Sequence, residues 1–189
     1  LAGRINLLLD NAKIGLLLVF AILAVFLEFR LAFWVALGIP ISFLGSFILL
    51  GNSDATVNMI SLFAYIVTLG MVVDDAIVVG ENIYEEHEKG RPWQEAAIVG
   101  AQQMIVPVTF AILTSIAAFA PLLLVPGVSG KFFRLIPLVV ISVLILSLIE
   151  SFFVLPAHLG HMKDKKPGIV RRIMAIPRKF VAKHLRKFI

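Results

Sequence analysis

The amino-acid sequence predicts an all-α fold: a polytopic transmembrane bundle of five spans followed by a C-terminal interfacial amphipathic helix. Hydrophobic residues make up 60% of the 189 residues and charged residues only 15%, whereas a soluble domain is about 45–50% apolar and about 25% charged. The apolar residues gather into runs of roughly 20, the length that crosses a bilayer as a helix. The chain has no cysteine, which excludes disulfides and thiolate metal sites.

The predicted spans form one domain over residues 1–160. The first span is the least regular, because its apolar run at 14–27 is short and has to be extended back toward Ile5. Prolines interrupt several runs, and membrane helices tolerate them because neighbouring groups satisfy the freed carbonyls. In chain order the spans cover residues 5–28, 31–50, 57–80, 96–125 and 132–156.

The orientation of the bundle follows from its positive charges. Five spans place the two ends of the chain on opposite sides of the membrane. Four of the 17 lysines and arginines fall on the side of the N-terminus, and the other 13 fall on the side of the C-terminus. The positive-inside rule then predicts a cytoplasmic C-terminus. The chain begins at Leu1 and lacks a signal-peptide pattern, so we expect it to be a piece of a longer protein.

The segment 161–189 carries most of the basic residues. Ile169, Ile173, Ile176 and Phe180 recur at near-helical spacing with lysine and arginine between them. Such a basic amphipathic helix lies in the membrane interface on the cytoplasmic side, where anionic lipid is its expected partner and nucleic acid is not. The alternative is a disordered basic linker, because Pro177 interrupts the pattern.

Two adjacent acids, Asp74 and Asp75, lie inside the third apolar run. A charge in the middle of a membrane helix costs about 2.5–3.5 kcal/mol. Asp75 precedes Glu81 by six residues, so it lies roughly 9 Å inside that end of the helix. Acids in such a place can take up and release protons as their surroundings change, as a proton-coupled machine requires. The alternative is a buried hydrogen-bonding pair that holds helices together.

The motif "GMVVDDAIVVGENI" at 70–83 resembles the signature of the resistance–nodulation–division (RND) transporters, in their hydrophobe/amphiphile efflux branch. The resemblance implies that the chain is the second to sixth transmembrane helices of the first half of a twelve-helix pump. The final segment would link the two halves. Four further motifs match the family in order and spacing: "FLEFRLAFWVALGIPISFLGSF" at 26–47, "RPWQEAAIVGAQQMIVPV" at 91–108, "FAPLLLVPGVSGKFFR" at 119–134 and "ESFFVLPAHL" at 150–159.

This resemblance implies a proton-driven efflux pump for drugs or amphiphiles in the bacterial inner membrane, with a periplasmic N-terminus and a cytoplasmic C-terminus. Asp74 and Asp75 would be its proton relay, paired with a lysine from the second half. The heavy-metal branch usually has a single aspartate followed by alanine, so Asp75 favours amphiphilic substrates. The resemblance further implies a homotrimer with a periplasmic adaptor and an outer-membrane channel. It implies no enzymatic activity and no cofactor.

Four other residues are secondary candidates. Glu150 is a further intramembrane acid, expected to reach the cytoplasmic edge or to bond a neighbouring helix. Glu81 and Asn82 are expected at a helix end that enters a solvated loop over residues 81–95. Thr68 lies near enough to take part in the relay. His158 and His161 have a metal-compatible spacing but no third ligand nearby, so no metal site is predicted.

Other functions fit the sequence less well. An intramembrane aspartyl protease needs acids facing each other from two helices, whereas these are adjacent on one helix. A lipid-sensing module of the same superfamily shape and the heavy-metal branch remain alternatives. An isolated fragment without activity is a further alternative, because the second half and the drug-binding region are absent from these residues.

Overall fold

A computed structural model describes residues 13–24, 29–51 and 58–162. The chain divides into two compact units, one of residues Trp34–Met162 and one of Leu1–Phe33 with Lys163–Ile189. In the described residues every regular element is a helix, which confirms the all-α prediction. The predicted interfacial segment lies outside the described residues, apart from its first two positions.

The described helices follow one another with short connections. The unit Trp34–Met162, called the second unit below, includes the helix Phe29–Leu50 from Trp34 onward. In chain order the labelled elements are α2 (Phe29–Leu50), α3 (Met59–Glu88), α4 (Trp93–Phe119), η1 (Ala120–Leu124), α5 (Gly127–Phe133), α6 (Leu135–Ile149), η2 (Glu150–Val154) and α7 (Leu155–Gly160).

Four helical stretches are long and apolar enough to cross a membrane, counted over the described residues only. They correspond to the second to fifth predicted spans. The first predicted span contains a shorter apolar helix, Lys13–Ala24. The rest of that span, 5–12 and 25–28, lies outside the described residues, so its crossing stays a prediction. The four stretches are Phe29–Leu50, Met59–Glu88, Trp93–Leu124 and Gly127–Gly160.

Helix α3 begins with a capping box and extends further than the sequence predicts. Asn58 Oδ1 accepts hydrogen bonds from the backbone N–H groups of Ile60 and Ser61, and Ser61 Oγ accepts one from the backbone N–H of Asn58. The predicted solvated loop over 81–95 is wrong, because α3 continues to Glu88 and α4 starts at Trp93. Polar residues alone do not end a helix; Gly90, with a φ of +99°, and Pro92 do.

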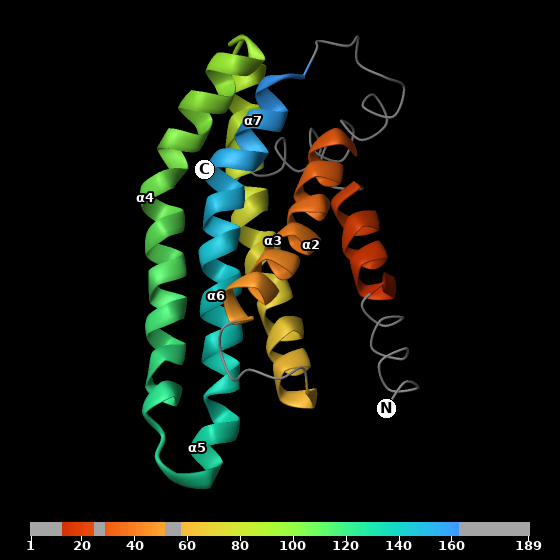
Figure 1. The fold of residues 1–189 in the computed structure, drawn as a ribbon. Helices are drawn as coiled ribbons and strands as arrows, with labels where there is room; N and C mark the ends of the chain where they lie inside the picture. Colours follow the sequence, from red (N-terminus) through yellow and green to blue (C-terminus); the bar gives the residue numbers. More distant parts are fainter. Residues whose placement is uncertain (1–12, 25–28, 52–57, 163–189) are drawn as a thin grey trace, which may run out of the picture. The chain divides into compact units, whose positions relative to one another are not determined.

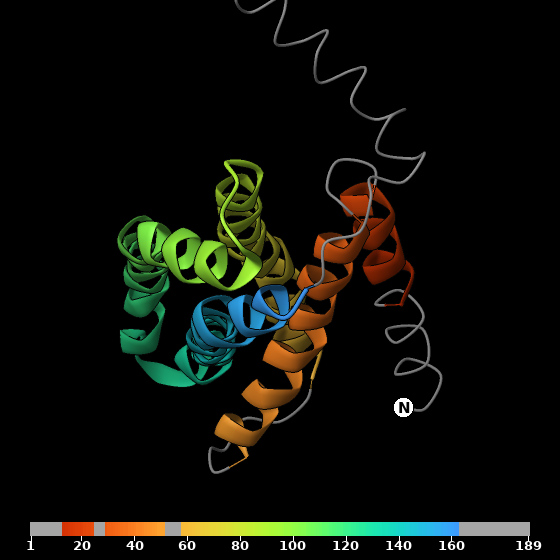
Figure 2. The same ribbon diagram turned by 90° about the horizontal axis from the view of Figure 1, so that it is seen from above.

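Within the second unit, α3 packs against both α4 and α6, and α7 returns onto α4 (Figure 1). The end-on view in Figure 2 shows these helices as a cluster rather than a row. The buried side of α3 presents small and β-branched residues, among them Ala64, Val72, Ala76 and Val79. Small residues let membrane helices approach closely. Helices α3 and α4 approach closely at Gly100 of α4, where an added Cβ would lie 2.6 Å from Ile83 Cα.

Proline inside the spans does not end them. Helices α2 and α4 continue through Pro40 and Pro107, respectively. This confirms the sequence-based reading that these prolines lie within membrane helices, where lost backbone hydrogen bonds are replaced by local adjustment.

Candidate functional site

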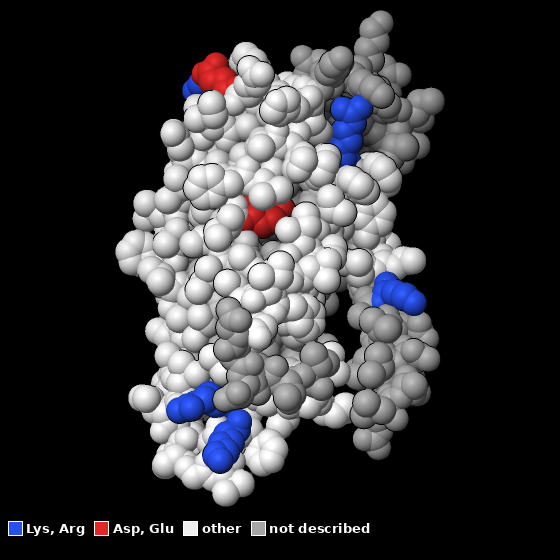
Figure 3. Space-filling view, viewed as in Figure 1, with Lys and Arg blue, Asp and Glu red and all other residues white. Residues whose placement is uncertain are grey.

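The aspartate pair lies near the middle of α3. Asp74 follows Met59 by 15 residues and precedes Glu88 by 14, so it is roughly 20 Å from either end of the helix. Asp74 is exposed and Asp75 is half-buried. The face of the molecule shown in Figure 3 is largely uncharged between the ends of the helices, apart from one small acidic patch at mid-height.

Asp74 belongs to a continuous stripe of exposed residues along α3. The members of the stripe recur every three or four positions, so they share one helix face. Most of them are apolar, and nothing in the described residues covers them. We call this stripe the open face of α3; it consists of Met59, Phe63, Ile66, Gly70, Asp74, Val78, Glu81 and Glu85.

Neither aspartate has an ion pair or a hydrogen bond within the described part of the chain. The cations beyond the end of α3 are already engaged, because Lys89 pairs with Glu85 and Glu86. Lys89 also follows Asp75 by 14 residues, about 21 Å along a helix. None of the ion pairs of the described residues therefore compensates the aspartates.

Thr68 is fully buried, and its Oγ1 donates to the backbone oxygen of Ala64 at 2.6 Å. It precedes Asp75 by seven residues, about 10 Å along the axis. The structure therefore does not bring Thr68 to the aspartates. Glu81 lies two turns beyond Asp74 on the same open face of α3.

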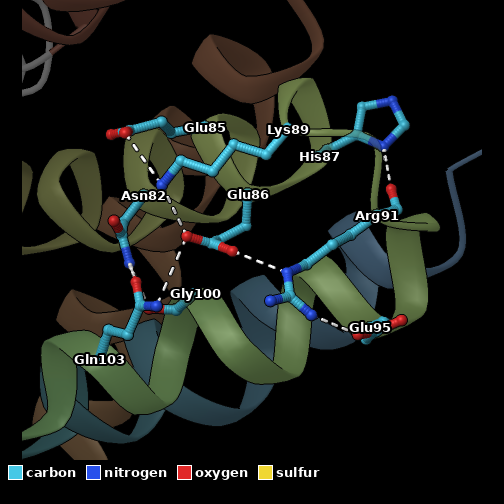
Figure 4. Close-up of polar contacts among 9 residues, drawn as sticks. All are labelled: Asn82, Glu85, Glu86, His87, Lys89, Arg91, Glu95, Gly100 and Gln103. Carbon is cyan, nitrogen blue, oxygen red and sulfur yellow. Dashed lines mark hydrogen bonds and ion pairs between the residues drawn. The ribbon is translucent and has the colours of Figure 1, made fainter.

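Asn82 joins α3 to α4 rather than marking a helix end. Its Nδ2 donates to the backbone oxygen of Gly100 and to Oε1 of Gln103, both at 2.8 Å (Figure 4). Glu150 is also held inside the bundle. Its side chain is 3% exposed, and both carboxyl oxygens lie against Gly38 of α2. It reaches the backbone of a neighbouring helix and not the cytoplasmic edge.

A buried acid at the end of α3 was missed by the sequence reasoning. Glu86 is 4% exposed, and its two oxygens accept hydrogen bonds from Lys89 Nζ and Arg91 Nε, each at 2.8 Å (Figure 4). Arg91 also pairs with Glu95. The hydrogen bonds with Glu86 and then Glu85 raise the pKa of Lys89 above its ordinary value. An acid three residues before a lysine was the available signal.

The two histidines near the end of the bundle have separate surroundings. The His158 ring stacks on Trp34 with centroids 3.8 Å apart, and His161 Nδ1 is 2.6 Å from the backbone oxygen of Ala157. Among the described residues, no group of three or more His, Cys, Asp or Glu side chains could hold a metal ion.

The long apolar helices and the uncompensated acids between their ends define a polytopic membrane bundle with an ionisable centre. The model of the AcrB/AcrD/AcrF family matches residues 5–178. The chain therefore belongs to this family of RND transporters, which confirms the resemblance seen in the motifs.

Individual relatives agree with this assignment. The chain is 34% identical to the multidrug resistance protein MdtC of Escherichia coli O139:H28 over 148 residues, 78% of this chain and 14% of that protein. It is 31% identical to MdtC of Pantoea ananatis over 178 residues, 89% of this chain and 17% of the relative. An uncharacterized transporter of Haemophilus influenzae is 37% identical over 119 residues, 62% and 12% of the two chains. The chain thus spans less than a fifth of the length of these relatives.

Proposed function

We propose that the chain is the membrane part of a proton/substrate antiporter that exports drugs or amphiphiles, with Asp74 and Asp75 as its proton relay. The observation that carries this proposal is the acid pair in the middle of a membrane-spanning helix, without a cation among the described residues. The MdtC relatives, which are multidrug resistance proteins, support the substrate class.

The relay needs a cationic partner that binds the aspartates reversibly. Asp74 lies on the open face of α3, so a cationic side chain from a second helix bundle can approach it. A proton on the pair removes one of its negative charges and weakens the attraction for that cation. The two bundles then lose an electrostatic contact of the kind that is strong in a low-dielectric interior. Helix movement that follows each protonation is the proposed link to substrate export.

We further propose that the whole transporter lies in the bacterial inner membrane with the α3–α4 turn on the cytoplasmic side, because 13 of the 17 lysines and arginines fall on that side in the predicted topology. Lys89 and Arg91 lie at this turn, and Lys131 and Arg134 lie at the other end of the helices. The remaining assembly, a second half, a homotrimer, a periplasmic adaptor and an outer-membrane channel, is proposed from the family. The orientation of the helices is tested with single cysteines, Glu88→Cys or Lys131→Cys, in a cysteine-free transporter. A membrane-impermeant maleimide added from the periplasm should label the cysteine at position 131 and not the one at position 88.

The proposal is tested by dye efflux from cells that express the full-length parent. Asp74→Asn and Asp75→Asn should each abolish efflux at membrane levels matched to the wild type. Glu95→Gln is the control, because it removes an exposed carboxylate at the helix end. Efflux that survives both aspartate substitutions would contradict the proposal and leave the acids as helix-packing groups.

The heavy-metal branch is the second candidate. It predicts that the same cells gain resistance to divalent metal ions rather than to amphiphilic dyes. The paired acids favour the first candidate, and metal resistance without dye efflux would reverse this choice.

A further inference from the structure

Glu150 lies in an unusual backbone segment inside the membrane-spanning stretch. It is the first residue of the π-helical turn η2, in which the N–H of Leu155 donates to the backbone oxygen of Glu150. Such single π turns leave a backbone group outside the regular ladder and occur frequently at functional sites. The Glu150 side chain is 3% exposed, and its Oε2 has no hydrogen-bond partner among the described residues. A buried acid without a partner requires an explanation.

The carboxyl group is pressed against the backbone of α2. A Cβ added to Gly38 would lie 2.6 Å from Glu150 Cδ and Oε1 and 2.7 Å from Oε2. Ser42 lies one turn further along the same face of α2. Ser147 and Ser151 lie on the face of α6 and η2 that carries Glu150. The hydroxyl groups of all three serines are buried and have no partner within the described part of the chain.

Among the described residues, no lysine or arginine lies on α3, α6, η2, α7 or the part of α2 within the second unit, the elements around this carboxyl. Helix α2 from Trp34 onward and helix α6 contain no titratable residue. On α7 the nearest is His158, about 12 Å further along the helix. On α3 the titratable groups at mid-membrane depth are Asp74 and Asp75, which are themselves acids. Helix α3 also carries the titratable Tyr65, whose hydroxyl pairs with Ser46.

Glu150 also differs from the aspartate pair in its access. Asp74 lies on the open face of α3, where a cation from another bundle can reach it. Glu150 is enclosed between α2 and η2, so a lysine from elsewhere could reach it only if these two elements separated. An unpaired carboxylate in such a place costs several kcal/mol. The smallest ligand that removes its charge is a proton, which needs no additional space.

We propose that Glu150 is a second proton-binding site, formed at the contact of α2 with η2 and separate from the aspartate pair. The bound proton removes the charge of the buried carboxylate and makes the carboxyl a hydrogen-bond donor. Release of the proton leaves a carboxylate without a cation and favours separation of α2 from η2 at Gly38. Proton binding at Glu150 thus holds the two elements together. This inference needs the folded bundle in its membrane but not the proposed efflux activity.

Infrared difference spectroscopy of the full-length transporter in lipid nanodiscs tests the site directly. A protonated carboxylic acid has a carbonyl stretch at a higher frequency than the corresponding stretches of a carboxylate or an amide. The expected result is such a band at neutral pH in the wild type, its loss in Glu150→Gln, and its persistence in the double variant Asp74→Asn/Asp75→Asn. An identical band in wild type and Glu150→Gln would overturn the inference. A band that appears only when sodium is removed would also overturn it, because the ligand would then be a metal cation.

A second pair of variants keeps the test independent of Glu150 itself. Gly38→Ala should shift or abolish the band, because the added methyl group displaces the carboxyl. Gly45→Ala is the matched control on α2, since its Cβ would meet Leu146 Cδ1, also at 2.6 Å. Equal spectra for the two glycine variants would contradict the placement of the proton at α2. Because none of these readouts uses transport, the inference and the proposed function can fail separately.

Discussion

The contact of α3 with α4 provides the sharpest stability prediction. In Gly100→Ala the new Cβ would lie 2.6 Å from Ile83 Cα and 2.8 Å from Ile83 N. Carbon atoms in contact prefer 3.5–4.0 Å, so the helices have to withdraw by about 1 Å at this point. These are backbone atoms, which cannot rotate aside. The withdrawal also stretches the hydrogen bond of Asn82 to the Gly100 carbonyl.

Overpacking of this kind costs about 1–3 kcal/mol, and a backbone clash belongs in the upper part of that range. Alanine regains up to about 1 kcal/mol in helix propensity. We expect a net loss of about 1–2 kcal/mol, a roughly 5- to 30-fold change in the unfolding equilibrium.

The assay is denaturant-induced unfolding of the full-length transporter in detergent micelles. Gly160→Ala on α7 is the control, because its Cβ would meet Ala97 Cβ of α4 at an ordinary 3.4 Å. It should be as stable as the wild type. A Gly100→Ala variant as stable as this control would refute the close approach of α3 and α4.

Three further predictions concern polar contacts between or beyond the helices. Ser46 and Tyr65 share a buried hydrogen bond of 2.7 Å. A double-mutant cycle of Ser46→Ala and Tyr65→Phe should therefore give a coupling free energy of about 0.6 kcal/mol, at most about 1.7 kcal/mol. A coupling of zero would contradict this hydrogen bond. Asn82→Ala should lower the unfolding free energy by about 1 kcal/mol through loss of its hydrogen bonds to α4, whereas Gln102→Ala, at an exposed position on α4, should leave it unchanged. The raised pKa of Lys89 means that its contribution to stability is complete below its ordinary value of 10.5 and lost as pH rises through the higher folded-state pKa. The stability difference between wild type and Lys89→Met should therefore shrink above about pH 10.5, and a constant difference would refute this.

The sequence was sufficient for the long helices and for the presence of an acid pair inside one of them, because long apolar runs and intramembrane charges are local features. It underestimated the depth of the pair, which lies roughly 20 Å and not about 9 Å from that helix end, because α3 continues to Glu88. It misplaced the end of α3, since the polar residues from Glu81 onward remain helical when Glu86 and Asn82 find partners on or near α4. The partners of Asn82 are 18 and 21 residues away in sequence, and spacing on one helix cannot reveal them.

The surroundings of Glu150 were beyond sequence reasoning for the same reason. The sequence left two alternatives for Glu150, the cytoplasmic edge or a bond to a neighbouring helix. Its contact with Gly38 could not be predicted, because this contact depends on how α2 packs on η2. The π turn at Glu150 likewise has no proline or glycine within it that would mark it in the sequence, since η2 ends at Val154 and Pro156 lies in α7. The open face of α3 became visible only once the covered faces were known.

The central claim, that Asp74 and Asp75 carry the transported protons, is tested most directly in proteoliposomes. The full-length transporter would be reconstituted with a pH-sensitive dye inside, and substrate would be added under an imposed pH gradient. We predict substrate-dependent proton flux in the wild type and in Glu95→Gln, and none in Asp74→Asn or Asp75→Asn. Undiminished proton flux in both aspartate variants would contradict the claim and place the coupling elsewhere in the protein.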